Sequence, residues 1–281
     1  MSSSFSWSRL IRFVDENGAV RYGDVVEERP ASEMIGTKVD TLDGDPFGAM
    51  TRTHQQATVT KILCPLESTP IFMCIGLNYR QHANEANLTI AEHPVVFTKP
   101  ADALNSPLDD VTVFLDIQSQ LDYEGELCVI IGKDGKNIPE AEALDYVLGY
   151  AAGNDVSARK FQLPPFSGGQ FCYGKSFDGF APVGPCIVSK TLIADPQTLD
   201  LVTRVDGELR QQTSTADMIW TVKQIIAHLS RGTTLRKGTI IMTGTPSGVG
   251  LFTPNGLLKD GSVVEVSISR VGSIQNKMVF E

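Results

Sequence analysis

Apolar positions along most of the chain either alternate with polar ones or form short runs, which is the pattern of β-strands. The first two such segments, residues 9–14 and 20–26, flank Glu16-Asn17-Gly18, whose Asn-Gly pair is typical of a hairpin turn. The pattern therefore predicts a fold that is mainly β. The other expected strands are residues 59–63, 71–76, 94–99, 127–131, 199–205, 239–242, 262–269 and 274–280.

Helical spacing of apolar residues occurs late in the chain, after Ser214 and Thr215, and predicts an amphipathic helix there. Pro139, followed by residues 141–148, predicts a second, short helix. Helices are few, and the expected fold class is mainly β with α. The apolar positions of the first helix are Met218, Ile219, Val222, Ile225, Ile226 and Leu229.

The composition of the chain changes near residue 65. Residues 27–57 are polar and interrupted by proline and glycine, and residues 65–70 begin and end with proline, as a linker does. We therefore predict a small β-rich N-terminal domain, residues 1–68, followed by a larger domain, residues 69–281. No candidate catalytic or metal-binding residue is found in the first domain.

A group of acidic residues leads directly into the expected buried strand at residues 127–131. Side chains alternate between the faces of a strand, so Asp122, Glu124 and Glu126 are expected on one face, each about 7 Å from the next. Buried carboxylates need a partner, and oxygen ligands favour Mg²⁺ or Mn²⁺. Asp155, in a polar break, would complete a metal-binding triad with the two glutamates. An exposed acidic edge is the alternative, and the Glu-x-Glu motif alone would favour it.

Two residues that follow the strand at residues 71–76 have the spacing of a catalytic pair. His82 and Glu85 stand three apart, so on one helical turn the carboxylate would orient the imidazole and stabilise its charge. A general base that activates water needs this arrangement. The alternative is an exposed loop histidine beside an unrelated glutamate, and the spacing alone would favour it.

Three cationic side chains and a glutamine are candidate partners of a substrate. Lys99 ends a short strand, where it would either meet an anionic substrate or be solvated. Arg159 and Gln162 follow Asp155 at +4 and +7, which on a helix would aim them in the same direction as the acid. For Lys175 a surface position is the commoner case, but a lysine also suits the developing negative charge of an enolate.

A glycine-rich segment at residues 243–250 follows the strand at residues 239–242. It lacks the Gly-Lys-Ser/Thr ending of a phosphate-binding loop. It would instead present backbone N–H groups and a hydroxyl to a carboxylate.

The composition excludes some function classes. The net charge is −9, from 24 basic and 33 acidic residues, which argues against binding to nucleic acid. No apolar run approaches the roughly 20 residues of a membrane span. The five cysteines are odd in number and unpatterned, which suits reduced thiols in a cytoplasmic protein. Residues 1–12 weakly resemble a transit peptide, so a mitochondrial location is the alternative, although residues 10–14 are better interpreted as a strand.

Seven segments between residues 70 and 281 carry a distinctive ordered set of residues. No single segment is decisive, but in this order they resemble the motifs of the fumarylacetoacetate hydrolase superfamily. The segments are Gly-x-Asn-Tyr-x-x-His-x-x-Glu (76–85), Phe-x-Lys-Pro (97–100), Asp-Tyr-Glu-x-Glu-Leu (122–127), Asn-Asp-x-Ser-x-Arg-x-x-Gln (154–162), Gly-Lys-Ser-x-Asp (174–178), Gly-Pro (184–185) and Thr-Gly-Thr-Pro-x-Gly-Val-Gly (243–250).

The resemblance implies a catalytic domain of the mixed β-roll type behind a small N-terminal domain, a homodimer, and a small 2-oxo acid as substrate. It implies Mg²⁺ or Mn²⁺ on Glu124, Glu126 and Asp155, with His82 and Glu85 on a segment that closes over the substrate. The implied site residues are, for catalysis, His82, Glu85, Lys175 and Gln162, and, for substrate binding, Arg80, Lys99, Arg159, Tyr173, Gly244 and Thr245.

These residues lead us to expect a metal-dependent enzyme that cleaves a C–C bond in a 2-oxo acid such as an acylpyruvate, through a metal-bound enolate. Oxaloacetate decarboxylation and oxaloacetate keto–enol tautomerisation are the alternatives, because they pass through the same enolate. Leu77-Asn78 stands where the branch that cleaves fumarylacetoacetate has an aspartate ligand, so the resemblance points to the acylpyruvate and oxaloacetate branch. A catalytically silent metal-binding homologue is a remote alternative, disfavoured because His82, Glu85 and Lys175 are all present.

Overall fold

The computed structural model describes residues 7–281, whose elements are mainly strands with three short α-helices. The weak likeness to a transit peptide falls partly on residues 1–6, which lie outside the described residues. Residues 9–14 form β1 (Arg9–Val14), so the strand expected there is confirmed. Within residues 7–281, no helix has the length and apolar character needed to cross a membrane.

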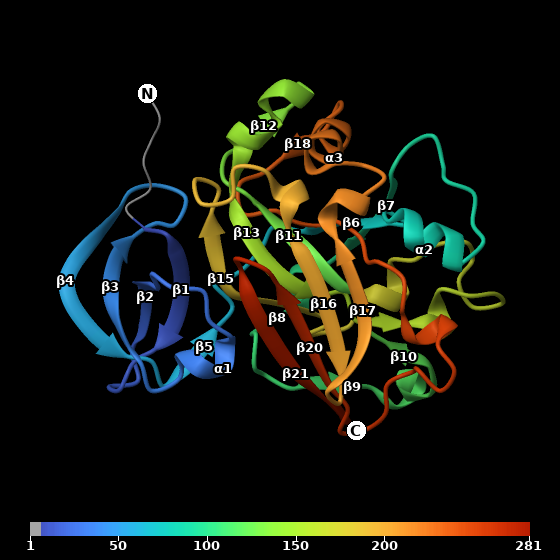
Figure 1. Ribbon diagram of the computed structural model, residues 1–281, viewed down its shortest axis with the longest axis horizontal. Coiled ribbons are helices and arrows are strands. Elements are labelled where there is room, and N and C mark those ends of the chain that lie inside the picture. Colours follow the sequence, from blue (N-terminus) through green and yellow to red (C-terminus); the bar gives the residue numbers. More distant parts are fainter. Residues whose placement is uncertain (1–6) are drawn as a thin grey trace.

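The N-terminal strands form an antiparallel meander, drawn in blue at the left of Figure 1. The predicted hairpin is confirmed, because β1 pairs with β2 (Val20–Asp24). Residues 27–57, for which no individual strand is predicted, contain α1 (Ala31–Met34), β3 (Lys38–Gly44) and most of β4 (Met50–Thr58). Most side chains of β4 are exposed, so the apolar alternation that predicts a strand is missing there.

The meander continues into a large sheet through the pairing of β1 with β15, in which Leu10 lies opposite Ile187. Sheet pairing therefore crosses the predicted domain boundary at residue 68, and the boundary itself stays a prediction. Two shorter strands, β5 (Lys61–Leu63) and β8 (Leu104–Asn105), pair with β1 and β15. Beyond β1, the large sheet runs in the order β15 (Ala181–Ser189), β13 (Val147–Asn154), β11 (Gly125–Ile131), β19 (Ile240–Met242), β6 (Phe72–Gly76) and β7 (Val95–Lys99).

A second sheet of five strands packs against the large one, and its orange and red strands are drawn in front in Figure 1. Two further strand pairs are β10 (Leu121–Asp122) with β14 (Ser157–Ala158), and β12 (Gly135–Lys136) with β18 (Thr234–Leu235). The order of the five-stranded sheet is β17 (Glu208–Ser214), β16 (Asp200–Val205), β20 (Val263–Ile268), β21 (Gly272–Phe280) and β9 (Val111–Val113).

Both faces of β11 are buried. Leu127, Val129 and Ile131 belong to the core between the two sheets, whereas Cys128 and Ile130 belong to a second apolar cluster on the opposite face. This alternation is the period of two that a strand requires. The buried strand expected at residues 127–131 is thereby confirmed, and it fixes the direction of the acidic side chains at its start.

Two helix expectations are wrong in detail. Residues 141–148 do not form an α-helix, because residues 140–146 are a 3₁₀ segment and residues 147–154 are β13, paired on both sides. The late amphipathic helix is α3 (Val222–Leu229), which begins after Thr221 rather than Ser214. Thr221 caps it with a reciprocal bond to Gln224, and this capping box sets the start of the helix.

Gly149 of β13 leaves no space for a side chain. A Cβ there would lie 2.2 Å from the carbonyl oxygen of Val188 and 2.6 Å from a methyl carbon of Ile187. Gly149→Ala is therefore expected to lower the free energy of unfolding by about 1–3 kcal/mol, the usual cost of overpacking. Chemical denaturation measures this change. Gly48→Ala is the control, because the nearest atom to its Cβ would be 3.5 Å away, and equal losses for both variants would contradict the packing argument.

The cysteines fit the expectation of reduced thiols, since all five are free. Four of them are buried, and Cys172 is partly buried. Burial raises the pKa of the Cys64 and Cys186 thiols to about 12, which keeps them protonated at neutral pH.

Candidate active site

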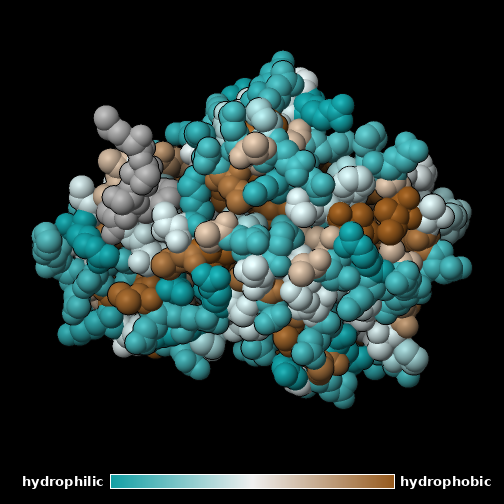
Figure 2. All heavy atoms as spheres, turned by 45° about the horizontal axis from the view of Figure 1, so that its top comes forward, coloured by the Kyte–Doolittle hydropathy of each residue, from teal (hydrophilic) through white to brown (hydrophobic). Residues whose placement is uncertain are grey.

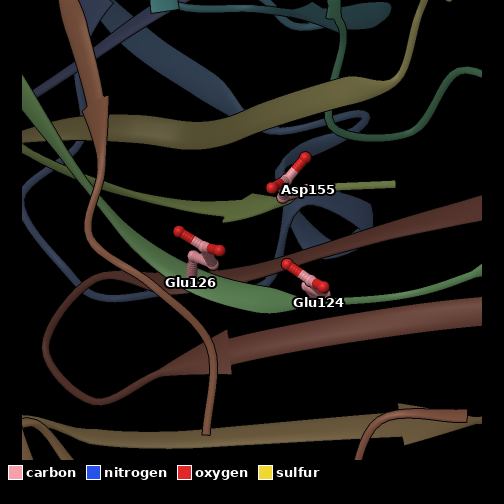
Figure 3. A group of neighbouring side chains, drawn as sticks. All are labelled: Glu124, Glu126 and Asp155. Atoms are coloured by element: carbon pink, nitrogen blue, oxygen red, sulfur yellow. The ribbon is translucent and has the colours of Figure 1, made fainter. Parts of the chain in front are cut away.

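Three acidic side chains gather where β11 begins and β13 ends. Glu124 and Glu126 flank the first residue of β11, and Asp155 follows β13. The pairing of Gly125 with Asn154 brings the two segments together, and the Asp155 N–H donates to the carbonyl of Glu124 at 2.9 Å. All three residues are buried, and one oxygen of each lies within 4.8 Å of the others. Figure 3 shows the three carboxylates directed toward a common space.

Two buried lysines neutralise part of this acidic group. The Lys175 ammonium lies 2.8 Å from Glu124 Oε2 and 2.7 Å from Asp155 Oδ2, and the Lys99 ammonium pairs with Asp155 Oδ1. Burial by itself raises the pKa of Glu124, but Lys175 and Arg159 outweigh it and lower the pKa to about 2. Glu124 is therefore held as a carboxylate at neutral pH.

Glu126 has a different environment. Its Oε2 accepts a hydrogen bond from the Gly244 N–H at 2.7 Å, and among the described residues it forms no ion pair. Burial, followed by the nearby charges of Asp155 and Glu124, raises the pKa of Glu126 well above its ordinary value. One carboxylate of the group thus lacks a cation, and the set consists only of hard oxygen donors. These residues fit a divalent cation such as Mg²⁺ or Mn²⁺.

Asp122 does not join this group, contrary to the expectation that it shares a face with Glu124. The strand is interrupted, because β10 ends at Asp122 and β11 begins at Gly125, so strict alternation is lost between them. The Asp122 carboxylate instead accepts from the N–H groups of Gly250, at 2.7 Å, and Leu251, at 2.9 Å. It also pairs with Arg159 Nε at 2.7 Å.

Arg159 links Asp122 to the acidic group. Its Nη1 lies 2.6 Å from Glu124 Oε1 and donates to Gln162 Oε1 at 2.8 Å, while its Nη2 is buried without a partner among the described residues. Arg159 and Gln162 were expected on a helical face after Asp155, and this is wrong, because β14 and a 3₁₀ turn occupy that segment. The side chains of Arg159 and Gln162 are nevertheless joined by this hydrogen bond.

The histidine and glutamate pair lies on α2 (Arg80–Glu85), as the spacing predicts. His82 Nδ1 lies 3.1 Å from Glu85 Oε2, and the Gly248 N–H donates to Glu85 Oε1 at 3.0 Å. The glycine-rich segment therefore holds the glutamate, which in turn orients the imidazole. Gly248 has a φ of 94°, and a Cβ there would lie 2.0 Å from the carbonyl oxygen of Arg210.

A cavity of about 320 Å³ lies between the acidic group and α2. Glu124 and Lys175 form part of its wall, with Glu126 and Asp155 close to them, and His82 also contributes to it. Many remaining lining residues are apolar. The other polar side chains of the wall belong to Thr89, Arg159, Gln162 and Thr245.

Four of the residues expected to bind substrate do not line this cavity. Lys99 is almost fully buried, next to Asp155. Tyr173 is 59% exposed and packs on Phe161, and Arg80 donates to the carbonyls of residues 217 and 218. Gly244, the fourth, contacts Glu126 through its backbone. Their roles in binding a substrate stay predictions.

The sequence interpretation missed Gln211 and the structural role of Asn78. Gln211 is buried, accepts from the Gly125 N–H at 3.0 Å and donates to Thr245 Oγ1 at 2.8 Å, so it positions both sides of the acidic group. The side-chain N–H groups of Asn78 donate to the carbonyls of Trp220 and Thr243, and its side-chain oxygen accepts from the Trp220 N–H. No spacing in the sequence indicates these contacts, because each joins segments more than 30 residues apart.

The fumarylacetoacetate (FAA) hydrolase C-terminal family model matches residues 71–279, which include every acidic and basic residue of the site. "Oxaloacetate tautomerase YisK" of Bacillus subtilis (strain 168) is 46% identical over 209 residues, which cover 73% of this chain and 68% of that protein. "Oxaloacetate tautomerase fahd2, mitochondrial" of Xenopus laevis is 40% identical over 219 residues, covering 78% of this chain and 68% of that protein.

Solved structures resemble the whole chain. The 2-hydroxyhepta-2,4-diene-1,7-dioate isomerase from Mycobacterium marinum superposes with a TM-score of 0.83 at 33% identity, covering 98% of this chain and 99% of that one. A fumarylacetoacetate hydrolase from Exiguobacterium antarcticum superposes with a TM-score of 0.79 at 35% identity, covering 98% and 100%. The fold and the ordered motifs agree with these comparisons, and the chain is a member of the fumarylacetoacetate hydrolase family.

Proposed function

We propose that this protein interconverts the keto and enol forms of a small 2-oxo acid, with oxaloacetate as the substrate and Mg²⁺ or Mn²⁺ as the cofactor. The observation that carries the proposal is the buried group of Glu124, Glu126 and Asp155, placed beside a cavity that also presents His82. The tautomerase names of two relatives support this reaction over the C–C hydrolysis that the sequence favoured.

The acidic group would hold the cation, which would supply Lewis-acid polarisation of the 2-oxo group. Tautomerisation moves a proton between carbon 3 and the 2-oxo oxygen, so the site needs a base and a group that stabilises negative charge. His82, oriented by Glu85, is the base in our proposal. Lys175 lies between two carboxylates at the cavity wall, where its ammonium would stabilise charge on the enolate oxygen. Gln162 and the free Nη2 of Arg159 would orient the substrate carboxylate.

Removal of the metal tests this proposal. The purified protein should accelerate the conversion of enol to keto oxaloacetate, followed by ultraviolet absorbance, in the presence of Mg²⁺ or Mn²⁺. After dialysis against EDTA the rate should fall to that of the spontaneous reaction, and Mg²⁺ should restore it. A folded protein that never exceeds the spontaneous rate with either metal would contradict the proposal.

Hydrolysis of an acylpyruvate is the second candidate, favoured by the His82–Glu85 pair and by the 35% identical hydrolase structure. Hydrolysis requires a water molecule activated by His82. Decarboxylation of oxaloacetate, the other alternative, requires only a group that accepts the electron pair of the C–C bond that breaks. Pyruvate release from acetylpyruvate and from oxaloacetate, measured in the same samples, separates these two reactions from tautomerisation.

The remaining expectations about partners and location stay proposals. We propose a homodimer that binds no nucleic acid and works in the cytoplasm. The printed name of the Xenopus laevis relative places that protein in mitochondria, which maintains the mitochondrial alternative.

A further inference from the structure

The cavity has two chemically different ends. One end carries Glu124, Lys175 and Arg159, which are connected by ion pairs. The apolar end begins at Phe97, whose ring centroid lies 5.0 Å from the Lys175 ammonium. Phe171 packs edge-on against Phe97, with 6.2 Å between the ring centroids, so an apolar wall extends directly outward from the acidic group.

A second apolar wall lies beside the histidine. The ring of Phe252 is 5.9 Å from that of His82, and Leu251 and Leu88 also line the cavity. A 2-oxo acid whose head contacts Lys175, and whose substituent on carbon 3 extends away from that head, would therefore place the far part of this substituent among apolar side chains, whichever wall it follows.

Several of these apolar side chains are exposed. Leu88 is 56% exposed, Phe252 44% and Phe171 38%, and all three line the same cavity. Clustered exposed apolar side chains at a cavity commonly mark a binding site. In Figure 2 most of the visible surface is hydrophilic, and one of its hydrophobic patches lies on the right, the side on which α2 and β7 appear in Figure 1.

The apolar end offers no lysine or arginine to a second carboxylate. Among the residues that line the cavity, all within the described part of the chain, the lysines and arginines are Lys175 and Arg159, and both are paired with acids. A charge at the far end of a long substituent would lose hydration without gaining a counterion, whereas an apolar substituent would gain from leaving water. The second carboxylate of oxaloacetate is bonded directly to carbon 3 and would stay at the charged end of the cavity.

Given the proposed function, we propose that the site also accepts 2-oxo acids that carry an aromatic or branched apolar group on carbon 3, and that it interconverts their keto and enol forms. In this reaction the C3–H bond breaks, its electron pair forms the C2–C3 double bond, and the 2-oxo oxygen takes up a proton. The reaction needs no oxidant, reductant or co-reactant. Phenylpyruvate is the simplest probe, because its ring matches the aromatic wall of Phe97 and Phe171.

The experiment compares kcat/KM for the tautomerisation of phenylpyruvate and of oxaloacetate by the Mg²⁺-loaded protein. The enol of phenylpyruvate absorbs in the ultraviolet because its double bond is conjugated with the ring. In the wild type both substrates should be turned over. Leu88→Asn and Phe171→Asn should each lower the ratio of kcat/KM for phenylpyruvate to that for oxaloacetate about ten-fold, which is the loss expected when one apolar contact is removed.

The matched control is Leu209→Asn. Leu209 is 49% exposed, similar to Leu88, but lies on β17 and does not line the cavity. The ratio should stay at the wild-type value in this variant. If the ratio fell equally in Leu209→Asn, the loss would come from replacing any exposed leucine by a polar residue, and the inference would be overturned.

Two outcomes separate this inference from the proposed function. Turnover of oxaloacetate without turnover of phenylpyruvate would overturn the inference and leave the proposed function intact. If neither substrate is turned over, the proposed function and the interconversion fail, and calorimetric binding of phenylpyruvate decides whether the site accepts an apolar 2-oxo acid. A Kd that rises about ten-fold in Leu88→Asn, but not in Leu209→Asn, would support the apolar subsite, and absence of binding would overturn it.

Discussion

Replacing Glu126 by glutamine is expected to abolish metal binding while leaving the metal-free protein at least as stable as the wild type. Burial and the charges of Asp155 and Glu124 disfavour the ionised form of Glu126, so a neutral side chain of the same shape removes an unfavourable charge. The Gly244 N–H keeps an acceptor in the amide oxygen. Loss of a direct ligand should weaken Mn²⁺ binding more than about 100-fold, the upper end of the loss for outer-shell partners.

Calorimetry with Mn²⁺ and thermal unfolding with and without Mg²⁺ measure the two effects. Mg²⁺ at about 100 times its Kd would add about 2.7 kcal/mol to the free energy of unfolding of the wild type, and this gain should vanish in Glu126→Gln. Glu142→Gln, an exposed change outside the site, should behave as the wild type. Unchanged Mn²⁺ affinity in Glu126→Gln would show that the cation binds elsewhere.

Replacing His82 by glutamine is expected to lower kcat about 10²–10⁴-fold, the usual contribution of general acid–base catalysis. Glutamine keeps a polar side chain on α2 but does not transfer a proton. Because His82 is the proposed base and does not belong to the acidic group, Mn²⁺ affinity should be unchanged. Stopped-flow absorbance with oxaloacetate gives kcat and KM, and calorimetry gives the affinity for the metal.

Two variants sharpen this test. Glu85→Gln should lower kcat about ten-fold and change KM little, because the imidazole remains but loses its charged partner. His54→Asn is the control, since His54 is exposed on β4 and has a φ of 59°, which asparagine tolerates. Unchanged turnover of every candidate 2-oxo acid in His82→Gln would favour the catalytically silent homologue instead.

Many of the strands and the Glu124–Glu126 pair were predictable because each leaves a local signal. An apolar run marks β11, and the Glu-x-Glu spacing at its start brings Glu124 and Glu126 into one group. The spacing of His82 and Glu85 likewise determines their contact once a helical turn forms. Such signals depend on neighbouring residues in the chain, so the sequence alone conveys them.

Other features depend on contacts that the sequence does not indicate. Residues 147 and 148, the end of the expected helix, belong to β13 because two neighbouring strands pair with that strand, and the sequence near them does not show this pairing. Asp122 leaves the acidic group because the strand is interrupted, and two of its backbone donors come from the distant residues 250 and 251. The apolar walls of the cavity combine Leu88, Phe171 and Phe252, which belong to three segments far apart in the chain, so no periodicity reveals them.

The pairing of β1 with β15 has a consequence for any attempt to shorten the protein. A chain that began after residue 68 would retain the segment matched by the family, but the N–H and C=O groups of β15 that face Leu10 would lose their partners. An uncovered strand edge recruits strands from other molecules. The N-terminal meander thus shields this strand edge of the large sheet from pairing with strands of other molecules.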